Sequence, residues 1–284
     1  MSPIDPDQQR AASHEAWEQA AAGWGRVADR VQDWSVALSA TMVDALALQP
    51  GQRVLELAAG PGDTGFMAAE LVLPGGTLIC SDGSEAMLDV ARERAAAQGI
   101  ANVEFRQLEL EWIDLRTAEI DAVLCRWGIM LIVDSDAAAH EIRRVLKPGG
   151  RAALAVWDEP SRNPWTTIPG NALIDLGHAE PPDPEEPGMF KLAADGALRE
   201  LLENAGLTDV KVAAVALERR FDDIDQYLAE TLAMSSRFRS AYRELDFDAQ
   251  VALKRTIARD ARPFTAADGS LALPGSSLVA SACA

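Results

Sequence analysis

A glycine-rich turn that follows an acidic residue is the part of this chain best suited to chemistry. The stretch Val54-Leu-Glu-Leu-Ala-Ala-Gly-Pro-Gly-Asp-Thr-Gly65 reads as a buried strand ending near Glu56, a turn, and the start of a helix. Glycine lets a backbone approach a ligand closely, so the turn predicts a small-molecule site. Gly60, Gly62 and Gly65 also match the G-x-G-x-x-G pattern of dinucleotide-binding folds.

The charge of Glu56 separates two possible ligands of this turn. In a dinucleotide fold, the helix after the turn directs its N–H groups and its dipole at a pyrophosphate. A carboxylate four residues before Gly60 would add negative charge near those phosphates. S-adenosylmethionine instead carries a sulfonium and an α-amino group, and Glu56 can hold the amino group directly or through water. The carboxylate therefore favours the cationic cofactor.

A second acidic residue, Asp82, lies at the end of the next predicted strand, twenty residues after Gly62. A carboxylate there can accept hydrogen bonds from both hydroxyls of a ribose. Both candidate cofactors contain a ribose, so Asp82 does not distinguish them. The alternative role for Asp82 is the N-cap of the following helix, but Ser84 fits that role better because the helical pattern begins at Glu85.

Strands and helices alternate around these residues. The strands are expected at 54–57, 77–81, 103–108, 122–125 and 151–157, with helices at 63–73, 85–98 and 137–146. This order predicts an α/β fold, a Rossmann-like doubly wound sheet of seven mostly parallel strands. Such sheets bind ligands beyond the carboxyl ends of their strands.

The remaining segments predict additions to this core. Residues 1–50 are expected to form an N-terminal helical cap of two or three helices, and residues 51–158 the cofactor-binding core. A proline-rich segment at 159–192 and a helical one at 222–268 are expected to form a lid over the substrate. Residues 193–221 and 269–284 would complete the sheet.

Three ordered motifs resemble those of a known family. Glu56-Leu-Ala-Ala-Gly-Pro-Gly62, Cys80-Ser-Asp-Gly-Ser-Glu-Ala-Met87 and Arg143-Arg-Val-Leu-Lys-Pro-Gly-Gly150 resemble successive motifs of class I S-adenosylmethionine-dependent methyltransferases. The branch they most resemble contains the small-molecule methyltransferases of ubiquinone and menaquinone biosynthesis. The resemblance covers residues 15–157 well. One departure is Ala58, where the family usually has glycine, so the added methyl group must fit beside the cofactor.

The resemblance also implies which residues hold S-adenosylmethionine, and S-adenosylhomocysteine after transfer. Glu109 would accept from the adenine amino group and the Leu110 N–H would reach a ring nitrogen, although a solvated acidic turn is the alternative. The segment Cys125-Arg-Trp-Gly128 matches one whose carbonyls usually hold the methionine amino group. The full set expected at the cofactor is Glu56, Ala58, Gly60, Gly62, Asp82, Gly83, Glu109, Leu110, Arg126 and Trp24.

The sequence contains fewer features that identify the methyl acceptor. Methyl transfer needs alignment, desolvation and, for an oxygen or carbon nucleophile, removal of a proton. His14 in the cap and His178 in the lid are the candidate general bases, because histidine titrates near neutrality; the alternative is that both are exposed bystanders. His140 is expected to be structural. The chain lacks the Asn-Pro-Pro-Tyr type motif of many amide N-methyltransferases, which favours transfer to oxygen or carbon.

Large apolar residues predict the character of the acceptor pocket. Trp17 and Trp24 resemble the family's N-terminal aromatic motif, which closes over cofactor and acceptor, and Trp127 follows the fourth strand. The lid contributes Trp165 and Phe190. These side chains favour an apolar or aromatic acceptor of the kind found in quinone-like or secondary metabolism. Packing within helices or core is the alternative for the tryptophans.

Composition narrows the setting. The chain has 284 residues and a formal net charge of −18, which disfavours binding to nucleic acid or anionic membranes. No apolar run approaches the length needed to span a bilayer. Three widely spaced cysteines argue for a reducing cytoplasm, and no metal-ligand spacing occurs among cysteines and histidines. Few lysines beside abundant arginine and alanine are typical of proteins that GC-rich bacterial genomes encode. A homodimer is one possible assembly.

Together these features predict a cytoplasmic S-adenosylmethionine-dependent methyltransferase acting on oxygen or carbon of a small apolar or aromatic metabolite. One alternative is an NAD(P)-dependent oxidoreductase, which the G-x-G-x-x-G match and Asp82 would support. A second alternative is a non-catalytic protein that binds S-adenosylmethionine as a structural or regulatory ligand, since no clear base is present.

Overall fold

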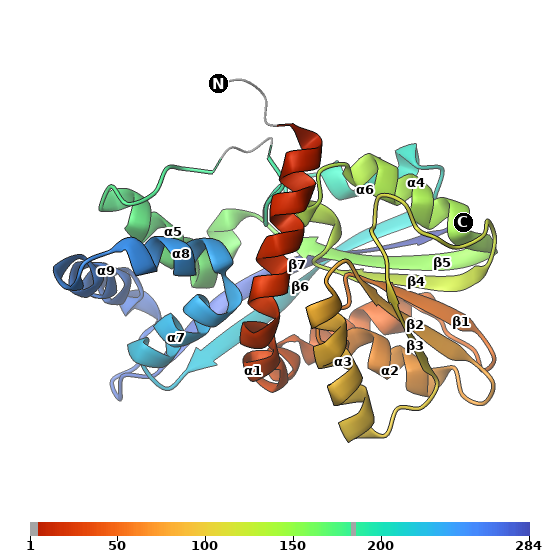
Figure 1. Cartoon of the computed structure of the whole chain (residues 1–284), viewed down its shortest axis with the longest axis horizontal. Helices are drawn as coiled ribbons and strands as arrows, with labels where there is room; N and C mark the ends of the chain where they lie inside the picture. The colour runs from red at the N-terminus through yellow and green to blue at the C-terminus, as the bar shows by residue number, and fades with distance from the viewer. Residues whose placement is uncertain (1–4, 183–185) are drawn as a thin grey trace.

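A twisted seven-stranded sheet organises the chain (Figure 1). The computed structural model describes residues 5–182 and 186–284. The strand order is β3-β2-β1-β4-β5-β7-β6, and only β7 runs antiparallel to its neighbours. This is the mostly parallel, seven-stranded Rossmann-like sheet that the sequence predicted. The strands are β1 (Arg53–Leu57), β2 (Thr77–Asp82), β3 (Val103–Gln107), β4 (Ile120–Arg126), β5 (Leu146–Trp157), β6 (Thr208–Phe221) and β7 (Leu271–Cys283).

Helices cover both faces of this sheet. On one side, α2 (Asp63–Leu71) and α3 (Glu85–Gln98) pack against β1, β2 and β3, and on the other α4 (Ser135–Val145) and α6 (Ala197–Asn204) pack near β5, β6 and β7 (Figure 1). The central strands are buried on both faces, as the near-continuous apolar sequences of β1 and β4 require. Ser84 caps α3 by accepting from the Met87 N–H at 3.2 Å, which confirms its predicted role.

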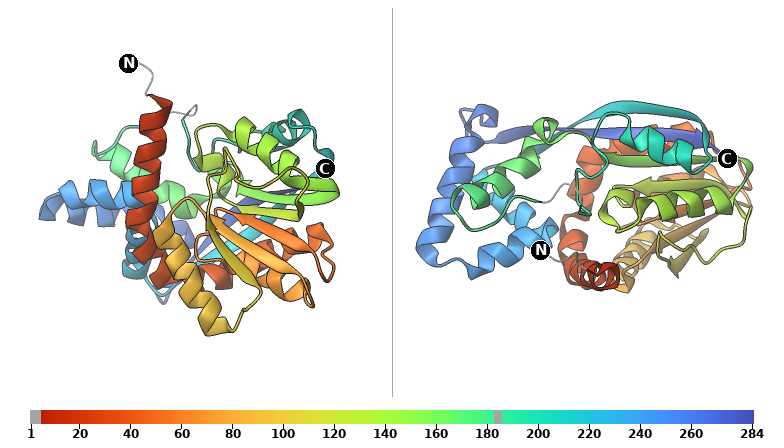
Figure 2. Two further views of the ribbon diagram at one scale, coloured as in Figure 1. Left: turned by 45° about the vertical axis from the view of Figure 1, so that its right-hand side comes forward. Right: turned by 90° about the horizontal axis from the view of Figure 1, so that it is seen from above.

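The N-terminal cap differs from its prediction. Instead of two or three helices, a single 41-residue helix, α1 (Pro6–Leu46), crosses the molecule (Figures 1 and 2). Glycine is a poor helix former, yet both Gly23 and Gly25 lie within this helix. Packing explains why Gly23 lies inside the helix: a Cβ at this position would fall 2.2 Å from the carbonyl oxygen of Ala233. Close contact with a second helix therefore outweighs the local propensity.

Strands β6 and β7 extend past the end of β5. Residues 271–276 of β7 pair with residues 216–221 of β6 and lie beyond the residues of β7 that pair with β5, and this two-stranded arm carries the C-terminal helices (Figure 2). These are α7 (Ile224–Met234), α8 (Ser236–Glu244) and α9 (Phe247–Asp260), with α5 (Pro164–Asp175) packed on α9. The described parts of the two segments predicted as a lid thus meet beside the carboxyl ends of the strands, and residues 183–185 of the first segment lie outside the described residues. Their division into domains stays a prediction.

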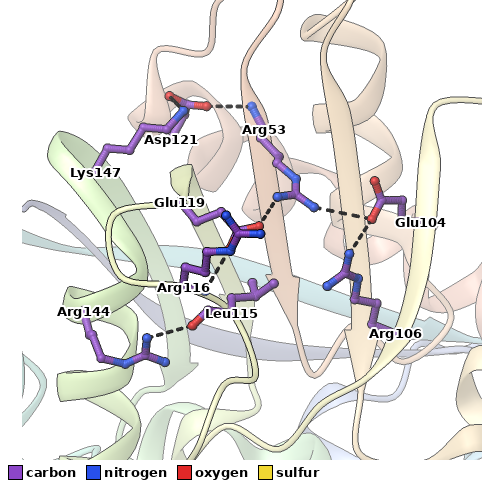
Figure 3. A network of polar contacts seen from close by, with 9 residues as sticks. All are labelled: Arg53, Glu104, Arg106, Leu115, Arg116, Glu119, Asp121, Arg144 and Lys147. Carbon is purple, nitrogen blue, oxygen red and sulfur yellow. Dashed lines mark hydrogen bonds and ion pairs between the residues drawn. The ribbon is translucent and has the colours of Figure 1, made fainter.

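The opposite, amino-terminal edge of the sheet is tied together by ion pairs (Figure 3). Asp121, at the start of β4, accepts from the backbone N–H of Arg53 at 2.8 Å and pairs with Lys147 at 2.7 Å. Arg53 also pairs with Glu119 and Glu104. Lys147 belongs to the motif at residues 143–150. This motif therefore helps to align the strands at the edge of the sheet opposite the glycine turn.

Within the described residues, no helix is long and apolar enough to cross a membrane.

Candidate active site

The glycine turn between β1 and α2 has a backbone conformation that favours glycine at two of its positions. Gly60 and Gly62 have φ angles of 53° and 89°, in the left-handed region that favours glycine. A Cβ at Gly62 would fall 2.4 Å from the Phe66 ring, whereas a Cβ at Gly60 would meet nothing within 4 Å. The backbone at Gly60 therefore has open space beside it, where a ligand can approach.

Ala58 is the unusual residue of this turn. It is not glycine, yet its φ is 49°, a conformation that costs an L-residue about 1 kcal/mol or more. Its methyl group lies against Gly128, just after β4: a Cβ at Gly128 would fall 2.4 Å from the Ala58 Cβ. The missing side chain at Gly128 thus makes room for the methyl group of Ala58. This contact also joins the glycine turn to the segment after β4.

Asp82, the last residue of β2, is bonded directly to the turn. One carboxylate oxygen accepts from the Gly60 N–H and the other from the Ser84 N–H, both at 2.9 Å. Burial raises the pKa of Asp82 from 3.8 to about 6, against the opposing effect of these two hydrogen bonds. Each oxygen keeps a lone pair, so an ionised Asp82 can still accept two hydrogen bonds.

Glu56 lies beneath the turn. Its side chain is only 2% exposed, and Oε1 accepts from the Gly65 N–H in the first turn of α2 at 2.8 Å. Oε2 has no hydrogen-bond partner among the described residues, and a Cβ at Gly65 would fall 2.2 Å from it. Burial raises the pKa of Glu56 from 4.5 to about 8, although Arg126 and the Gly65 N–H pull in the opposite direction.

Arg126, the last residue of β4, directs its side chain into the protein. The guanidinium donates to Ser35 Oγ at 2.7 Å and to Asp63 Oδ2 at 3.2 Å. Asp63, the first residue of α2, also pairs with Arg94 of α3 at 2.7 Å. The Arg126 side chain therefore braces α1, α2 and β4 against one another, and its role at the cofactor stays a prediction.

The residues expected at adenine follow β3. The carboxylate oxygens of Glu109 lie 3.2 Å from the point where a Cβ at Gly83 would sit, so the two segments are close together. Glu109 is exposed, whereas Leu110 is buried. Glu109, Gly83 and Asp82 thus line one side of the strand ends next to the turn.

The seven tryptophans separate into different groups. Trp17 and Trp24 of α1 lie 6.3 Å apart and pack with Met87 at the start of α3. A second group, here called the tryptophan cluster, comprises Trp34, Trp127, Trp157 and Trp165. Its rings are in mutual contact, with centroids as close as 4.3 Å between Trp127 and Trp157.

The tryptophan cluster lies where strands β4 and β5 end. Trp127 follows β4, has a φ of 62°, and donates from Nε1 to Ser277 Oγ at 2.9 Å. Trp157 is the last residue of β5, Trp34 comes from α1 and Trp165 from α5. Two of the residues predicted at the acceptor, Trp127 and Trp165, are therefore brought together.

The other acceptor and base candidates are more dispersed. Trp17 packs with Trp24 and Met87 outside the tryptophan cluster, and Phe190 packs, partly buried, against the core. His14 lies on α1 and His178 just after α5, and both are exposed. An exposed histidine is a weak candidate for a protected general base, so the catalytic role of these two residues stays a prediction.

Sequence reasoning missed several residues next to this region. Trp34, Trp157 and the fully buried Arg219 of β6 were not singled out, nor was Asp63. The alternation in β6 carries the missing signal: residues 217, 219 and 221 are buried while 218 and 220 are exposed. This period places an arginine on the inner face of a strand. For Trp157, the missed signal is its position at the carboxyl end of a strand, where ligands bind in such sheets.

The residues present are suited to S-adenosylmethionine. Asp82 offers free acceptor sites for ribose hydroxyls, Gly60 leaves open space above the turn, and Glu56 has an orphaned buried oxygen that a cation would satisfy. Asp82 and Glu56 are both acidic, which matches a ligand with a sulfonium and an ammonium group and not one with a pyrophosphate.

Comparisons with known proteins agree with this chemistry. Residues 48–171 match a family model described as a methyltransferase domain. The ubiquinone/menaquinone biosynthesis C-methyltransferase of Cellvibrio japonicus is 33% identical over 119 residues, 42% of this chain and 48% of that protein. Its Pasteurella multocida counterpart is 29% identical over 194 residues, 63% of this chain and 72% of that protein. The chain spans about half the length of the first curated relatives it matches.

Solved structures agree on the fold. The YcgJ protein of Bacillus subtilis superposes with a TM-score of 0.58 at 16% identity, over 86% of this chain and 97% of that one. Taken with the glycine turn, Asp82 and the strand order, these findings show what the chain is similar to. It resembles the class I S-adenosylmethionine-dependent methyltransferases, and among them the ubiquinone/menaquinone-biosynthesis branch.

Proposed function

We propose that this protein transfers a methyl group from S-adenosylmethionine to an oxygen or carbon atom of a small aromatic molecule. The proposal rests on the hydrogen bond that the Gly60 N–H donates to the Asp82 carboxylate. This contact places a carboxylate and an open glycine backbone together at the carboxyl ends of the strands. The cofactor supplies an electrophilic methyl group when bound.

Residues in and beside the glycine turn would bind different parts of the cofactor. Asp82 would accept from the two ribose hydroxyls, and Gly60 and Gly62 would let the backbone lie against the cofactor. Glu56 would hold the α-amino group directly or through one water molecule. Glu109 and Leu110 would face the adenine, since Glu109 lies beside Gly83.

The acceptor would bind on the tryptophan cluster. Gly128 contacts Ala58 of the turn, and the preceding Trp127 stacks on Trp157, so the cluster begins where the cofactor turn ends. Indole faces favour offset stacking with aromatic ligands. In this arrangement the protein aligns the acceptor and excludes water, the two tasks that methyl transfer requires most.

A transfer assay with isotopically labelled S-adenosylmethionine tests this function. The purified chain is incubated with a panel of phenols, hydroquinones, naphthols and indoles, and labelled product is measured after extraction. We expect transfer to at least one aromatic oxygen or carbon acceptor. Binding of the cofactor without transfer to any member would favour the non-catalytic alternative.

The topology favours this function over a nicotinamide-dependent oxidoreductase. The dinucleotide fold has six parallel strands in the order 3-2-1-4-5-6. Here an antiparallel β7 is inserted between β5 and β6. The buried carboxylate of Glu56 beneath the turn would also oppose a pyrophosphate.

A further inference from the structure

Arg219 is an arginine buried at the edge of the tryptophan cluster. It is 2% exposed, and its guanidinium carbon lies 4.6 Å from the ring centroid of Trp165 and 5.1 Å from that of Trp34. The ring of Phe221 lies 5.0 Å away on the same strand. Burying an unpaired guanidinium is strongly unfavourable, so a charge at this position requires a partner.

The partners that the protein supplies do not balance the charge. Glu230 of α7 pairs with Arg219 at 3.0 Å and with Arg30 of α1 at 2.5 Å. Two guanidiniums therefore share one carboxylate. Arg30 has a 43% exposed side chain, whereas those of Glu230 and Arg219 are buried, so the group runs from the surface to the tryptophan cluster.

Two buried N–H donors in this group also lack an acceptor. Arg219 Nε and Trp34 Nε1 have no hydrogen-bond partner within residues 5–182 and 186–284. Buried donors without partners are rare in folded proteins, and each destabilises the folded state. Both donors lie on residues whose rings and guanidinium are in contact. Glu230 satisfies neither donor, because its Oε2 pairs with a terminal nitrogen of Arg219 and its Oε1 lies against Arg30.

We propose that Arg219 and Trp34 recognise a carboxylate on the methyl acceptor, so that the substrate is an aromatic carboxylic acid. This inference rests on the proposed methyltransferase function. The carboxylate would accept from Arg219 Nε and Trp34 Nε1 and would balance the charge of the Arg30–Glu230–Arg219 group. The aromatic ring of the substrate would then stack on the tryptophan cluster, which adjoins the cofactor turn through Gly128.

The test compares acids with neutral amides of the same shape. Binding of indole-3-carboxylate and indole-3-carboxamide, and of naphthalene-2-carboxylate and its amide, is measured calorimetrically with S-adenosylhomocysteine present. In the wild type we expect each acid to bind at least about tenfold more tightly than its amide, the contribution of one charge-assisted hydrogen bond. Arg219→Met should abolish this preference while changing amide affinity by less than about threefold.

Two further variants isolate the cause. Trp34→Phe keeps an aromatic ring but removes the Nε1 donor, and should lower acid affinity by about three- to tenfold more than it lowers amide affinity. Arg220→Met removes the same charge from the adjacent, 79% exposed side chain of the same strand, and should preserve the preference.

The outcomes separate this inference from the proposed function. Equal binding of acids and amides to the wild type, no binding of any acid, or an unchanged preference in Arg219→Met would each overturn the inference. The affinity of each variant for S-adenosylhomocysteine is measured in the same titrations and reports the integrity of the cofactor site. A wild type that does not bind S-adenosylhomocysteine would instead overturn the proposed function.

Discussion

Replacing Glu56 with glutamine should stabilise the fold of the free protein and weaken cofactor binding at the same time. The Glu56 side chain is 2% exposed, and among the described residues only one of its oxygens has a hydrogen-bond partner, the Gly65 N–H at 2.8 Å. Glutamine has nearly the same shape, and its carbonyl oxygen can accept the same hydrogen bond. The substitution therefore removes the ability to ionise and little else.

The size of the effect follows from the pKa of Glu56, which burial raises from 4.5 to about 8. Each pKa unit corresponds to about 1.4 kcal/mol, so ionising Glu56 costs about 5 kcal/mol more in the folded chain than in the unfolded chain. The folded state binds the proton more tightly. Folding stability is therefore lost as pH rises from about 4.5 to about 8, and changes little from this cause above that range.

Thermal unfolding of Glu56→Gln and wild type at pH 5 and pH 8.5 measures this difference. At pH 8.5 the variant should unfold roughly 10–20 °C higher, since about 1 kcal/mol shifts Tm by about 2–4 °C in a chain of this size. At pH 5 the two proteins should unfold within about 2 °C of each other. A variant that is less stable at pH 8.5, or a gap of equal size at both pH values, would refute the reasoning.

The same variant should bind S-adenosylhomocysteine more weakly, by about ten- to a hundredfold. Glutamine lacks the negative charge that would hold the α-amino group, and a hydrogen bond to a charged group contributes about 1.5–3 kcal/mol. Calorimetry at pH 7.5 measures this loss. A variant that is stabilised but binds with unchanged affinity would show that Glu56 braces α2 without contacting the cofactor.

Three further predictions concern the cofactor site and α1. Because the pKa of Asp82 is about 6 and that of Glu56 about 8, cofactor affinity should fall by at least about tenfold from pH 7 to pH 5 as both carboxyls gain protons, and Asp82→Asn should bind weakly across that whole range in calorimetric titrations. Gly23→Ala should destabilise the fold by about 1–3 kcal/mol in urea unfolding, because its Cβ would fall 2.2 Å from a carbonyl oxygen of α7, whereas Gly25→Ala, 3.4 Å from side-chain atoms of α3, should be neutral or stabilising. Arg10→Ala removes an ion pair of 2.6 Å to Glu111, so amide hydrogens in the first two turns of α1 should exchange faster, while those of the last turns stay unchanged.

The sequence predicted those parts of the molecule whose signals are local. The alternation of apolar strands with helices predicted the parallel core, and Ser84 before Glu85 predicted the start of α3, where the Ser84 hydroxyl caps the helix. The glycine turn and Asp82 were found because strand ends in such a sheet converge on one edge.

The parts that depend on contacts between distant segments were missed. The continuous course of α1 through Gly23 was missed, because the close approach of Ala233, 210 residues later in the sequence, cannot be read from neighbours in the chain. Arg219 drew no attention because its meaning comes from Trp34, Trp165 and Glu230, which belong to three other elements. The position of Gly128 against Ala58 likewise explains a departure from the family motif that the sequence left open.

A calorimetric titration of the full chain with S-adenosylmethionine tests the central claim most directly. We predict one binding site per chain with a dissociation constant in the micromolar range, and binding reduced at least about tenfold in Asp82→Asn, which loses charged acceptors for the ribose hydroxyls. No heat of binding at millimolar S-adenosylmethionine, or equal affinity in the wild type and Asp82→Asn, would contradict the account.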